Sequence, residues 1–191
     1  MKNLEGKIVY KGKTKNGLQI LVRYPSKKDI KAIWKLINAL SQERTFITFQ
    51  GERITLLEET KYLEGQLEKI AKRKAVQLMA FSDGKLLGTT TIEMKDKVTR
   101  HIGNFGIIIA KDSRGQGTGK LLMKLAIDEA VKNIPDLEII TLQVFANNPL
   151  AYEMYKKFGF EEYGRLPYGI KLENKYSDDI NMYKRVRGVK N

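Results

Sequence analysis

The chain has 191 residues, 42% of them hydrophobic, with no apolar run long enough to cross a bilayer and no signal-like N-terminus, so we expect one globular, cytoplasmic domain without a membrane partner. Cysteine is absent and His101 is the one histidine, which excludes disulfides, thiolate metal sites, a cysteine nucleophile and zinc sites built on several imidazoles. The net charge of +13 attracts anions such as nucleic acids, acidic lipids or a polyphosphate cofactor, but the basic residues are scattered and do not predict dedicated nucleic-acid binding.

The N-terminal residues predict a β-hairpin followed by a helix. Two apolar segments at 7–12 and 18–24 flank a turn in which Asn16 and Gly17 favour a tight reversal. Ser26 then forms a capping box with the acidic residue three positions later, which marks a helix start. Apolar residues follow at helical spacing: Ile30, Ile33, Trp34, Ile37 and Leu40.

A second capping box, Thr55 with Glu58, predicts a helix to about Lys74 after an irregular connector at 41–53. The later elements are expected as strands 75–81, 85–95 and 101–110, a glycine-rich turn and helix to Asn133, a strand 138–145, a helix 148–158, and strands 159–166 and 180–186. The resulting order, β-β-α-α-β-β-β-α-β-α-β-β, is mixed. It predicts an α+β domain with a central, largely antiparallel sheet.

The stretch RGQGTGK, residues 114–120, lies between an apolar strand and an amphipathic helix pattern. A nucleotide-binding P-loop needs a glycine where Arg114 stands and a hydroxyl residue where Leu121 stands, and no dinucleotide fingerprint fits the three glycines. Glycines allow close backbone approach, and the unpaired N–H groups of a first helical turn bind anions. The pattern favours an anion site, and the alternative is a glycine-rich helix start without a ligand.

Two blocks of sequence resemble the GNAT superfamily of acetyl-CoA-dependent N-acetyltransferases. The first, FGIIIAKDSRGQGTGKLLMKLAIDEA, resembles that family's acetyl-CoA-binding motif, and the second is LQVFANNPLAYEMYKKFGF. Five residues of the second block fall at the family's spacing: Asn148, Ala151, Tyr155, Gly159 and Phe160. The resemblance covers about 76–165. It implies the GNAT fold for a single domain over 1–191, with its core at about 18–187 and 1–17 as an added N-terminal strand.

The resemblance also implies acetyl-CoA as donor. The backbone of Ile107, Ile108 and Ile109 would pair with its pantetheine arm, and Asn148 would contact the same arm. Tyr155 would lie near the thioester sulfur, contact the cofactor and protonate the departing thiolate. The alternative for Tyr155 is a core aromatic packed with neighbours on its own helix. The loop would hold the pyrophosphate through Arg114, Gly115, Gln116, Gly117, Thr118, Gly119 and Lys120.

The implied reaction is direct transfer of the acetyl group to an amine, with the N–H near Ile109 polarising the carbonyl oxygen. The amine must lose a proton first, because alkyl amines are mostly protonated at neutral pH. The strand before the loop offers no carboxylate, so His101 and Glu93 are the candidate bases. Each has a structural alternative, a hydrogen-bonded or solvated strand residue.

The acceptor is not readable from the sequence. In this fold acceptors meet the first two helices, their connector and the later strands, which implicates 41–53 and 163–179. Their carboxylates would suit a small amine, an amino acid or a polyamine, but solvated surface charge is the alternative for most of them. Protein N-terminal acetylation of the ribosomal-protein type and a non-catalytic acetyl-CoA-binding module stay open, as does a homodimer. The polar and aromatic residues concerned are Glu43, Arg44, Thr45, Phe46, Tyr168, Glu173, Asp178 and Asp179.

Overall fold

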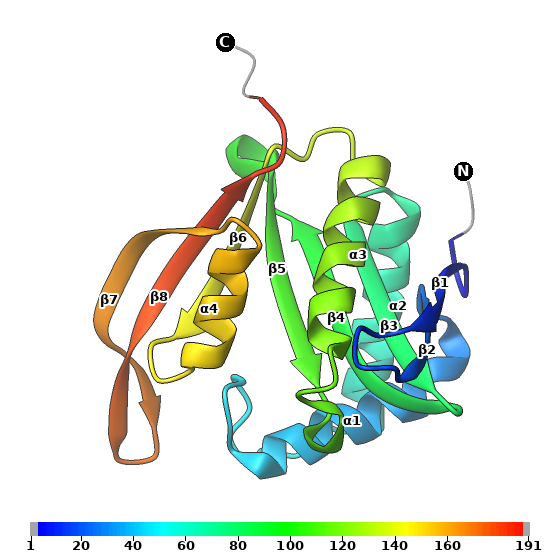
Figure 1. Cartoon of the computed structure of the whole chain (residues 1–191), viewed down its shortest axis with the longest axis horizontal. Coiled ribbons are helices and arrows are strands. Elements are labelled where there is room, and N and C mark those ends of the chain that lie inside the picture. The colour runs from blue at the N-terminus through cyan, green and yellow to red at the C-terminus, as the bar shows by residue number, and fades with distance from the viewer. Residues whose placement is uncertain (1–3, 189–191) are drawn as a thin grey trace. The chain divides into compact units, whose positions relative to one another are not determined.

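The computed structural model describes residues 4–188, so the first three residues of the predicted N-terminal strand extension lie outside the described residues. The elements follow the predicted order (Figure 1). They are β1 (Ile8–Lys13), β2 (Gln19–Arg23), α1 (Ile30–Glu43), α2 (Leu56–Ala71), β3 (Ala75–Ser82), β4 (Lys85–Met94), β5 (Ile102–Ile109), α3 (Thr118–Asn133), β6 (Ile139–Phe145), α4 (Pro149–Lys157), β7 (Glu161–Leu172) and β8 (Lys175–Arg185).

The strands are hydrogen-bonded in the order β1-β2-β3-β4-β5-β6-β8-β7. The pair β5–β6 is parallel, whereas β1–β2, β2–β3, β3–β4, β6–β8 and β7–β8 are antiparallel. The prediction of an α+β fold with a mixed, largely antiparallel sheet and an added N-terminal hairpin is confirmed. In the part of the chain that the structure describes, no helix is long and apolar enough to span a membrane.

The chain divides into two compact units. Unit 1 comprises the residues up to Glu93 together with Gly106–Pro135, and unit 2 comprises Met94–Phe105 together with the residues from Asp136 onward. Strand β5 therefore contributes its first half to unit 2 and its second half to unit 1. This division does not test the prediction of a single domain, which stays a prediction.

In unit 1, helices cover both faces of the strands (Figure 1). Helices α1 and α2 lie on one face, where Leu40 and Leu63 pack with Met79 and Phe81 of β3. Helix α3 lies on the other face and buries an apolar stripe of Leu122, Met123, Ala126 and Ala130. The Tyr24 hydroxyl, directly after β2, donates to a carboxylate oxygen of Glu129 in α3 at 2.9 Å.

Both predicted capping boxes form. The Ser26 amide donates to Asp29 at 2.7 Å, and the Thr55 amide donates to Glu58 at 2.7 Å. A short 3₁₀ turn, Lys27–Asp29, precedes α1. The connector between α1 and α2 is also fixed, because Trp34 of α1 donates its indole N–H to the carbonyl of Ile54 at 2.8 Å.

In unit 2, β6, β8 and β7 form an antiparallel sheet, and α4 follows β6. The predicted final strands, 159–166 and 180–186, were too short: β7 and β8 form a hairpin that reaches Leu172 and Lys175. Pro167 and the nearby glycines are typical of loops, so the sequence did not predict this part of β7 as a strand. An edge strand tolerates them, and the register shift between Leu166 and Ile170 absorbs the irregular backbone.

Candidate active site

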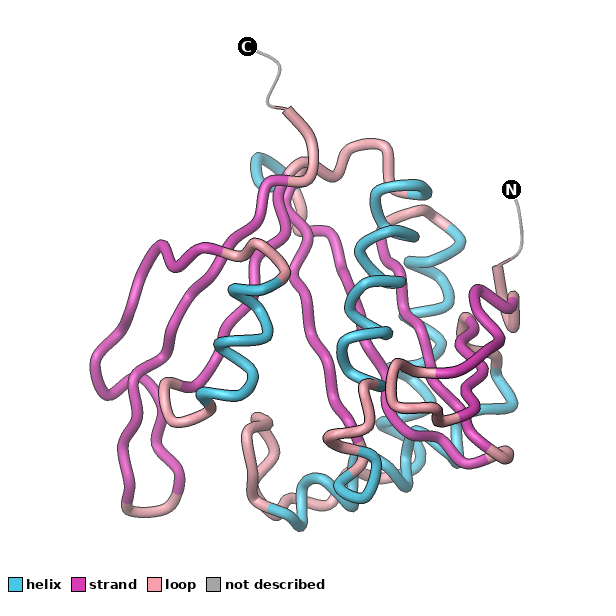
Figure 2. The backbone as a smooth tube through the Cα atoms, viewed as in Figure 1, coloured by secondary structure: helices cyan, strands magenta, loops and turns pink. Residues whose placement is uncertain are grey.

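The glycine-rich loop joins β5 to α3 in unit 1 (Figure 2). A 3₁₀ turn, Lys111–Ser113, redirects the chain after β5, and Gly117 then caps the N-terminus of α3. Gly115 and Gly117 have φ of +74° and +83°, in the left-handed region that side chains with a Cβ rarely adopt. The backbone of this turn therefore requires glycine at two of the three positions, whereas Gly119 lies inside α3 and has no positive φ.

The amide groups of the loop are free to donate. In residues 4–188, no backbone or side-chain acceptor is hydrogen-bonded to the amide nitrogens of 115–120. The first residue of α3 with such a bond is Leu121, which donates to the carbonyl of Gly117 at 3.1 Å. The hydroxyl of Thr118 is fully buried and also lacks a partner among these residues. Unpaired donors at the positive end of a 16-residue helix make a site for an anion.

The turn of the β1–β2 hairpin holds this loop from outside. The side-chain amide of Asn16 donates to the carbonyl of Gly115 at 3.0 Å. A Cβ at Gly117 would lie 3.5 Å from the Cβ of Thr14, so the hairpin turn also fits closely against the cap of α3. These contacts turn one carbonyl of the loop toward the hairpin and fix the loop backbone. Neither Thr14 nor Asn16 was predicted from the sequence to be a site residue.

Arg114 and Lys120 differ in their surroundings. The guanidinium of Arg114 forms a bidentate pair with Glu43 of α1, at 2.9 and 2.7 Å, and its Nε donates to the carbonyl of Ile109 at 3.2 Å. Its charge is thus largely neutralised within the protein. The Lys120 side chain is exposed and makes no ion pair among the described residues. Lys120 is therefore the loop cation that a phosphate can use directly.

The second half of β5 presents alternate backbone groups to its two sides. At one end of β5 the Ile102 carbonyl accepts from the amide of Lys95, and at the other end the Ala110 amide donates to the carbonyl of Leu87. Both bonds fit one antiparallel register between β4 and β5, in which the even-numbered residues of β5 face β4. Because the ladder alternates, N–H and C=O of Ile107 and Ile109 point away from β4. On that side β6 pairs only as far as Asn104 in the described residues. The residues predicted to bind the pantetheine arm therefore lie beyond the last pair of the β5–β6 ladder.

The two candidate bases from the sequence lie in different units. Glu93, in unit 1, accepts from Gln66 at 2.7 Å and from Lys69 at 2.6 Å, so both its carboxylate oxygens are engaged by α2. His101, in unit 2, is half-buried, and its backbone carbonyl accepts from the amides of Glu138 and Ile139. Its imidazole forms no hydrogen bond within residues 4–188.

Tyr155 and Asn148 lie on α4 of unit 2. The Tyr155 side chain is 7% exposed, and its ring lies 6.0 Å from Phe105, edge-on, and 6.2 Å from Phe160. Burial raises the pKa of Tyr155 to about 12, so the phenol keeps its proton at neutral pH. Asn148 caps α4 by accepting from the amide of Ala151 at 3.2 Å, and its side-chain NH₂ has no hydrogen-bond acceptor within residues 4–188.

Glu59 of α2 is a functional candidate that the sequence analysis missed. It is 6% exposed, and among the described residues no hydrogen bond or ion pair engages its carboxylate. Burial raises the pKa of Glu59 above its ordinary value. The signal was present in the helical spacing, because Glu59 shares a buried stripe with Leu63, Gln66 and Ile70.

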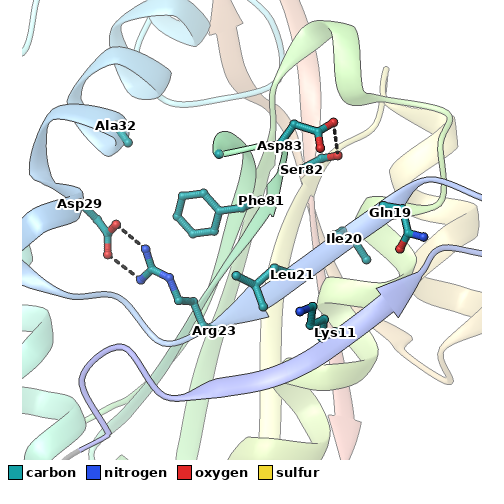
Figure 3. A pocket seen from close by; sticks show the side chains of 11 residues that line it. Lys11, Gln19, Ile20, Leu21, Arg23, Asp29, Ala32, Phe81, Ser82 and Asp83 are labelled. Carbon is teal, nitrogen blue, oxygen red and sulfur yellow. Dashed lines mark hydrogen bonds and ion pairs between the residues drawn. The ribbon is translucent and has the colours of Figure 1, made fainter.

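A pocket of about 490 Å³ opens in unit 1 beside the N-terminal hairpin (Figure 3). The Arg23 guanidinium pairs with Asp29 at 2.6 and 2.7 Å and lies 4.5 Å from the ring centroid of Phe81. None of the predicted site residues lines it; its residues are Lys11, Gln19, Ile20, Leu21, Arg23, Asp29, Ala32, Phe81, Ser82, Asp83 and Gly84. Residues 4–188 contain no cluster of three His, Asp or Glu side chains that could hold a metal ion.

The chain is similar in sequence to known acetyltransferases. The L-amino acid N-acetyltransferase AaaT of Escherichia coli (strain K12) is 35% identical over 96 residues, which are 49% of this chain and 59% of that protein. Spermidine N(1)-acetyltransferase of Vibrio cholerae is 35% identical over 79 residues, 41% of this chain and 45% of that protein. The chain thus spans about half the length of the curated relatives it matches.

A crystal structure of an acetyltransferase of the GNAT family from Streptococcus pneumoniae superposes with a TM-score of 0.80 at 30% identity, over 87% of this chain and 99% of that one. The model of the Acetyltransferase (GNAT) family matches residues 35–160, from the first turns of α1 to the end of the second motif block. That match covers more than half of the sequence, so the chain belongs to the GNAT family of acetyltransferases.

Proposed function

We propose that the protein is an N-acetyltransferase that moves the acetyl group of acetyl-CoA directly to a primary amine. The observation that carries the proposal is the row of unpartnered amide groups at 115–120, which start a long helix in the position of the family's cofactor motif. Membership of the family and the loop geometry both support acetyl-CoA as the donor.

The residues present fit acetyl-CoA. The loop amides and Lys120 would hold the pyrophosphate, the outward backbone of Ile107 and Ile109 would pair with the pantetheine arm, and Asn148 would donate from its free NH₂ group. When bound, acetyl-CoA supplies a thioester carbonyl that an amine can attack. An N–H directed away from β4, near Ile109, would stabilise the negative charge on that oxygen.

In this proposal Tyr155 supplies the proton for the departing thiolate. Its burial among Phe105 and Phe160 keeps the phenol neutral, because the charged phenolate is disfavoured without water. A neutral phenol donates a proton more readily to a thiolate formed beside it than to bulk water. The protein would then release coenzyme A as a thiol.

For the acceptor we propose a small primary amine, either an amino acid or a polyamine. The names of two relatives, an L-amino acid and a spermidine acetyltransferase, support this class. Protein N-terminal acetylation is the alternative enzyme function, and a non-catalytic acetyl-CoA-binding module is the alternative outside enzymes. The cytoplasmic location and a homodimer stay predictions.

The test is turnover of acetyl-CoA, followed by thiol release, against a panel of spermidine, L-lysine, other amino acids, an aminoglycoside and peptides with free N-termini. We expect one small amine to give the highest kcat/KM. A peptide as the best substrate would support protein N-terminal acetylation instead. Tight acetyl-CoA binding without turnover on any member would support the non-catalytic module.

A further inference from the structure

We propose that Glu59 of α2 is the general base that takes a proton from the acceptor amine, an inference that rests on the proposed function. Neither the sequence motifs nor the family resemblance assigns a role to this residue. Three features of unit 1 carry the inference: the placement of Glu59 over β4 and β5, its burial without a partner, and the opposite state of Glu93 on the same face.

The contacts between α2 and β4 fix where Glu59 lies. Gln66 and Lys69 donate to Glu93, and one turn earlier the Tyr62 hydroxyl lies next to the side chain of Thr91. The helix therefore runs parallel to β4, and each helical turn of about 5.4 Å advances roughly two strand residues. One more turn toward the N-terminus brings Glu59 level with Thr89.

The register between β4 and β5 extends this placement to the reaction centre. The Thr90 hydroxyl donates to the carbonyl of Gly106 at 2.9 Å, and the Ala110 amide donates to the carbonyl of Leu87 at 2.8 Å. Thr89 therefore lies opposite Ile108, whose side chain packs in the core cluster beneath α1 and α2. Glu59 is thus level with the segment proposed to polarise the thioester carbonyl, on the α1–α2 face of the sheet.

The chemistry of Glu59 suits proton transfer. A buried carboxylate without a counter-ion binds a proton more tightly than an exposed one, because burial disfavours its charge. The titratable groups that face it are the hydroxyl of Tyr62 and, beyond this hydroxyl, Glu93. Partial desolvation raises the pKa of Tyr62, and the negative charges of Glu93 and Glu59 raise it further.

Glu93, the carboxylate predicted from the sequence, is held in the opposite state. Its ion pair with Lys69 and its hydrogen bond from Gln66 occupy both carboxylate oxygens. An amine would have to displace one of these partners to be deprotonated there. Glu59 needs no such displacement.

In the proposed reaction the acceptor nitrogen loses two protons in all. An ammonium group, R–NH₃⁺, gives one proton to the Glu59 carboxylate, and the freed electron pair on nitrogen forms the C–N bond to the acetyl carbon. The C–S bond breaks with its electron pair on sulfur. The second proton lost by nitrogen matches the one that the thiolate gains through Tyr155, and Glu59 returns its proton to water.

The experiment compares Glu59→Gln with Glu93→Gln and His101→Ala, with spermidine and L-lysine as acceptors. In the wild type, kcat/KM should be nearly independent of pH above the pKa of Glu59. In Glu59→Gln it should fall about 100-fold at pH 7 and rise tenfold per pH unit, because only the free amine reacts. In Glu93→Gln and His101→Ala the pH profile of kcat/KM should run parallel to that of the wild type.

A structural readout separates this role from simple damage. The pKa of Glu59 is raised in the folded state, so its contribution to stability is present below its unfolded pKa and is lost as the pH rises through the folded pKa. Glu59→Gln should therefore melt at a higher temperature than the wild type at pH 7 and at the same temperature near pH 3. Acetyl-CoA affinity should not change.

Several results would overturn the inference. One is a pH dependence of kcat/KM in Glu59→Gln that runs parallel to that of the wild type. Another is a tenfold rise in kcat/KM per pH unit in Glu93→Gln or His101→Ala instead. A third is a loss of activity in Glu59→Gln that is accompanied by lower stability or weaker acetyl-CoA binding. A wild type without turnover on any amine would instead remove the proposed function, and the inference with it. Normal wild-type turnover with a fully active Glu59→Gln would remove the inference alone.

Discussion

Asp29 and Glu59 are equally buried, at 6% exposure, yet their pKa values move in opposite directions. Burial alone would raise the pKa of Asp29, but hydrogen bonds from Arg23 and Ser26 and the charge of Arg23 lower it. Among the described residues Glu59 has no such partner, so burial decides the direction in which its pKa moves. At the junction of β2 and α1 the buried carboxylate of Asp29 forms a structural ion pair. On the face between α2 and β4 the buried carboxylate of Glu59 is left without a partner among the described residues.

The strongest test of this contrast is Asp29→Asn. It leaves the guanidinium of Arg23 partly buried without a countercharge, so we expect the free energy of unfolding to fall by about 3 kcal/mol at pH 7. The pKa of Asp29 is lowered in the folded state, so its contribution is present above its unfolded pKa and lost as pH falls through the folded pKa. The difference between variant and wild type should therefore shrink in acid.

Urea unfolding at pH 7 and at pH 3 would measure both effects. Asp128→Asn is the matched control, because Asp128 pairs with Lys124 on the exposed face of α3 and should change stability by less than about 0.5 kcal/mol. Equal losses in the two variants would contradict the distinction between a buried and an exposed pair.

A second test concerns Tyr155, a buried acid of unit 2 that has no charged partner among the described residues. Tyr155→Phe should lower kcat about 100-fold, because a general acid contributes roughly that much, and should leave acetyl-CoA affinity unchanged. With a pKa of about 12, Tyr155 should produce no limb in the pH profile below pH 10. Steady-state kinetics and calorimetry would check these outcomes.

Tyr152→Phe provides the comparison for that variant, since Tyr152 lies on the same helix and its hydroxyl donates to Glu162 at 3.1 Å on the surface. It should retain full activity. If the two phenylalanine variants behave alike, Tyr155 is a core aromatic and not an acid.

A third test compares binding through charged side chains with binding through backbone amides. The donor loop is proposed to bind through amides, so Gly117→Ala should raise KM for acetyl-CoA about tenfold with little change in kcat. The reason is that its φ of +83° costs an L-residue about 1–2 kcal/mol. Gly6→Ala imposes similar strain at φ of +69°, in open space before β1, and should leave KM unchanged. An equal KM in both variants would remove the loop from the donor site.

The smallest effect is expected from the hairpin turn. Asn16→Ala removes one hydrogen bond to the loop, worth about 1 kcal/mol, so KM for acetyl-CoA should rise about fivefold. Asn174→Ala, in the turn between β7 and β8, is the control. An unchanged KM in Asn16→Ala would show that the loop keeps its conformation without the hairpin.

The element order and the donor loop could be predicted because their signals are local. Capping residues lie three positions apart, and the glycines of the loop lie within five residues. The contact of Asn16 with Gly115 and the pair of Arg114 with Glu43 join residues 99 and 71 positions apart, so no local pattern contains them. The extended β7–β8 hairpin was missed because its strand pairing outweighs the turn propensity of Pro167.

The choice between Glu59 and Glu93 could not be made from residue types, because both are glutamates next to apolar positions. What separates them is whether Lys69 and Gln66 reach the carboxylate, and this depends on the register of α2 against β4. For the same reason the sequence could not show that Arg114, predicted to hold the pyrophosphate, is paired with Glu43 of α1.

The chain contains a single tryptophan, and its indole N–H is bonded to the carbonyl of Ile54 at the end of the α1–α2 connector. Indole emission responds to the polarity and hydrogen bonding of its surroundings. Trp34 is therefore a built-in optical probe whose spectrum follows the connector without any label. Titrating candidate amines while recording this fluorescence would report directly on whether the connector moves when an acceptor binds.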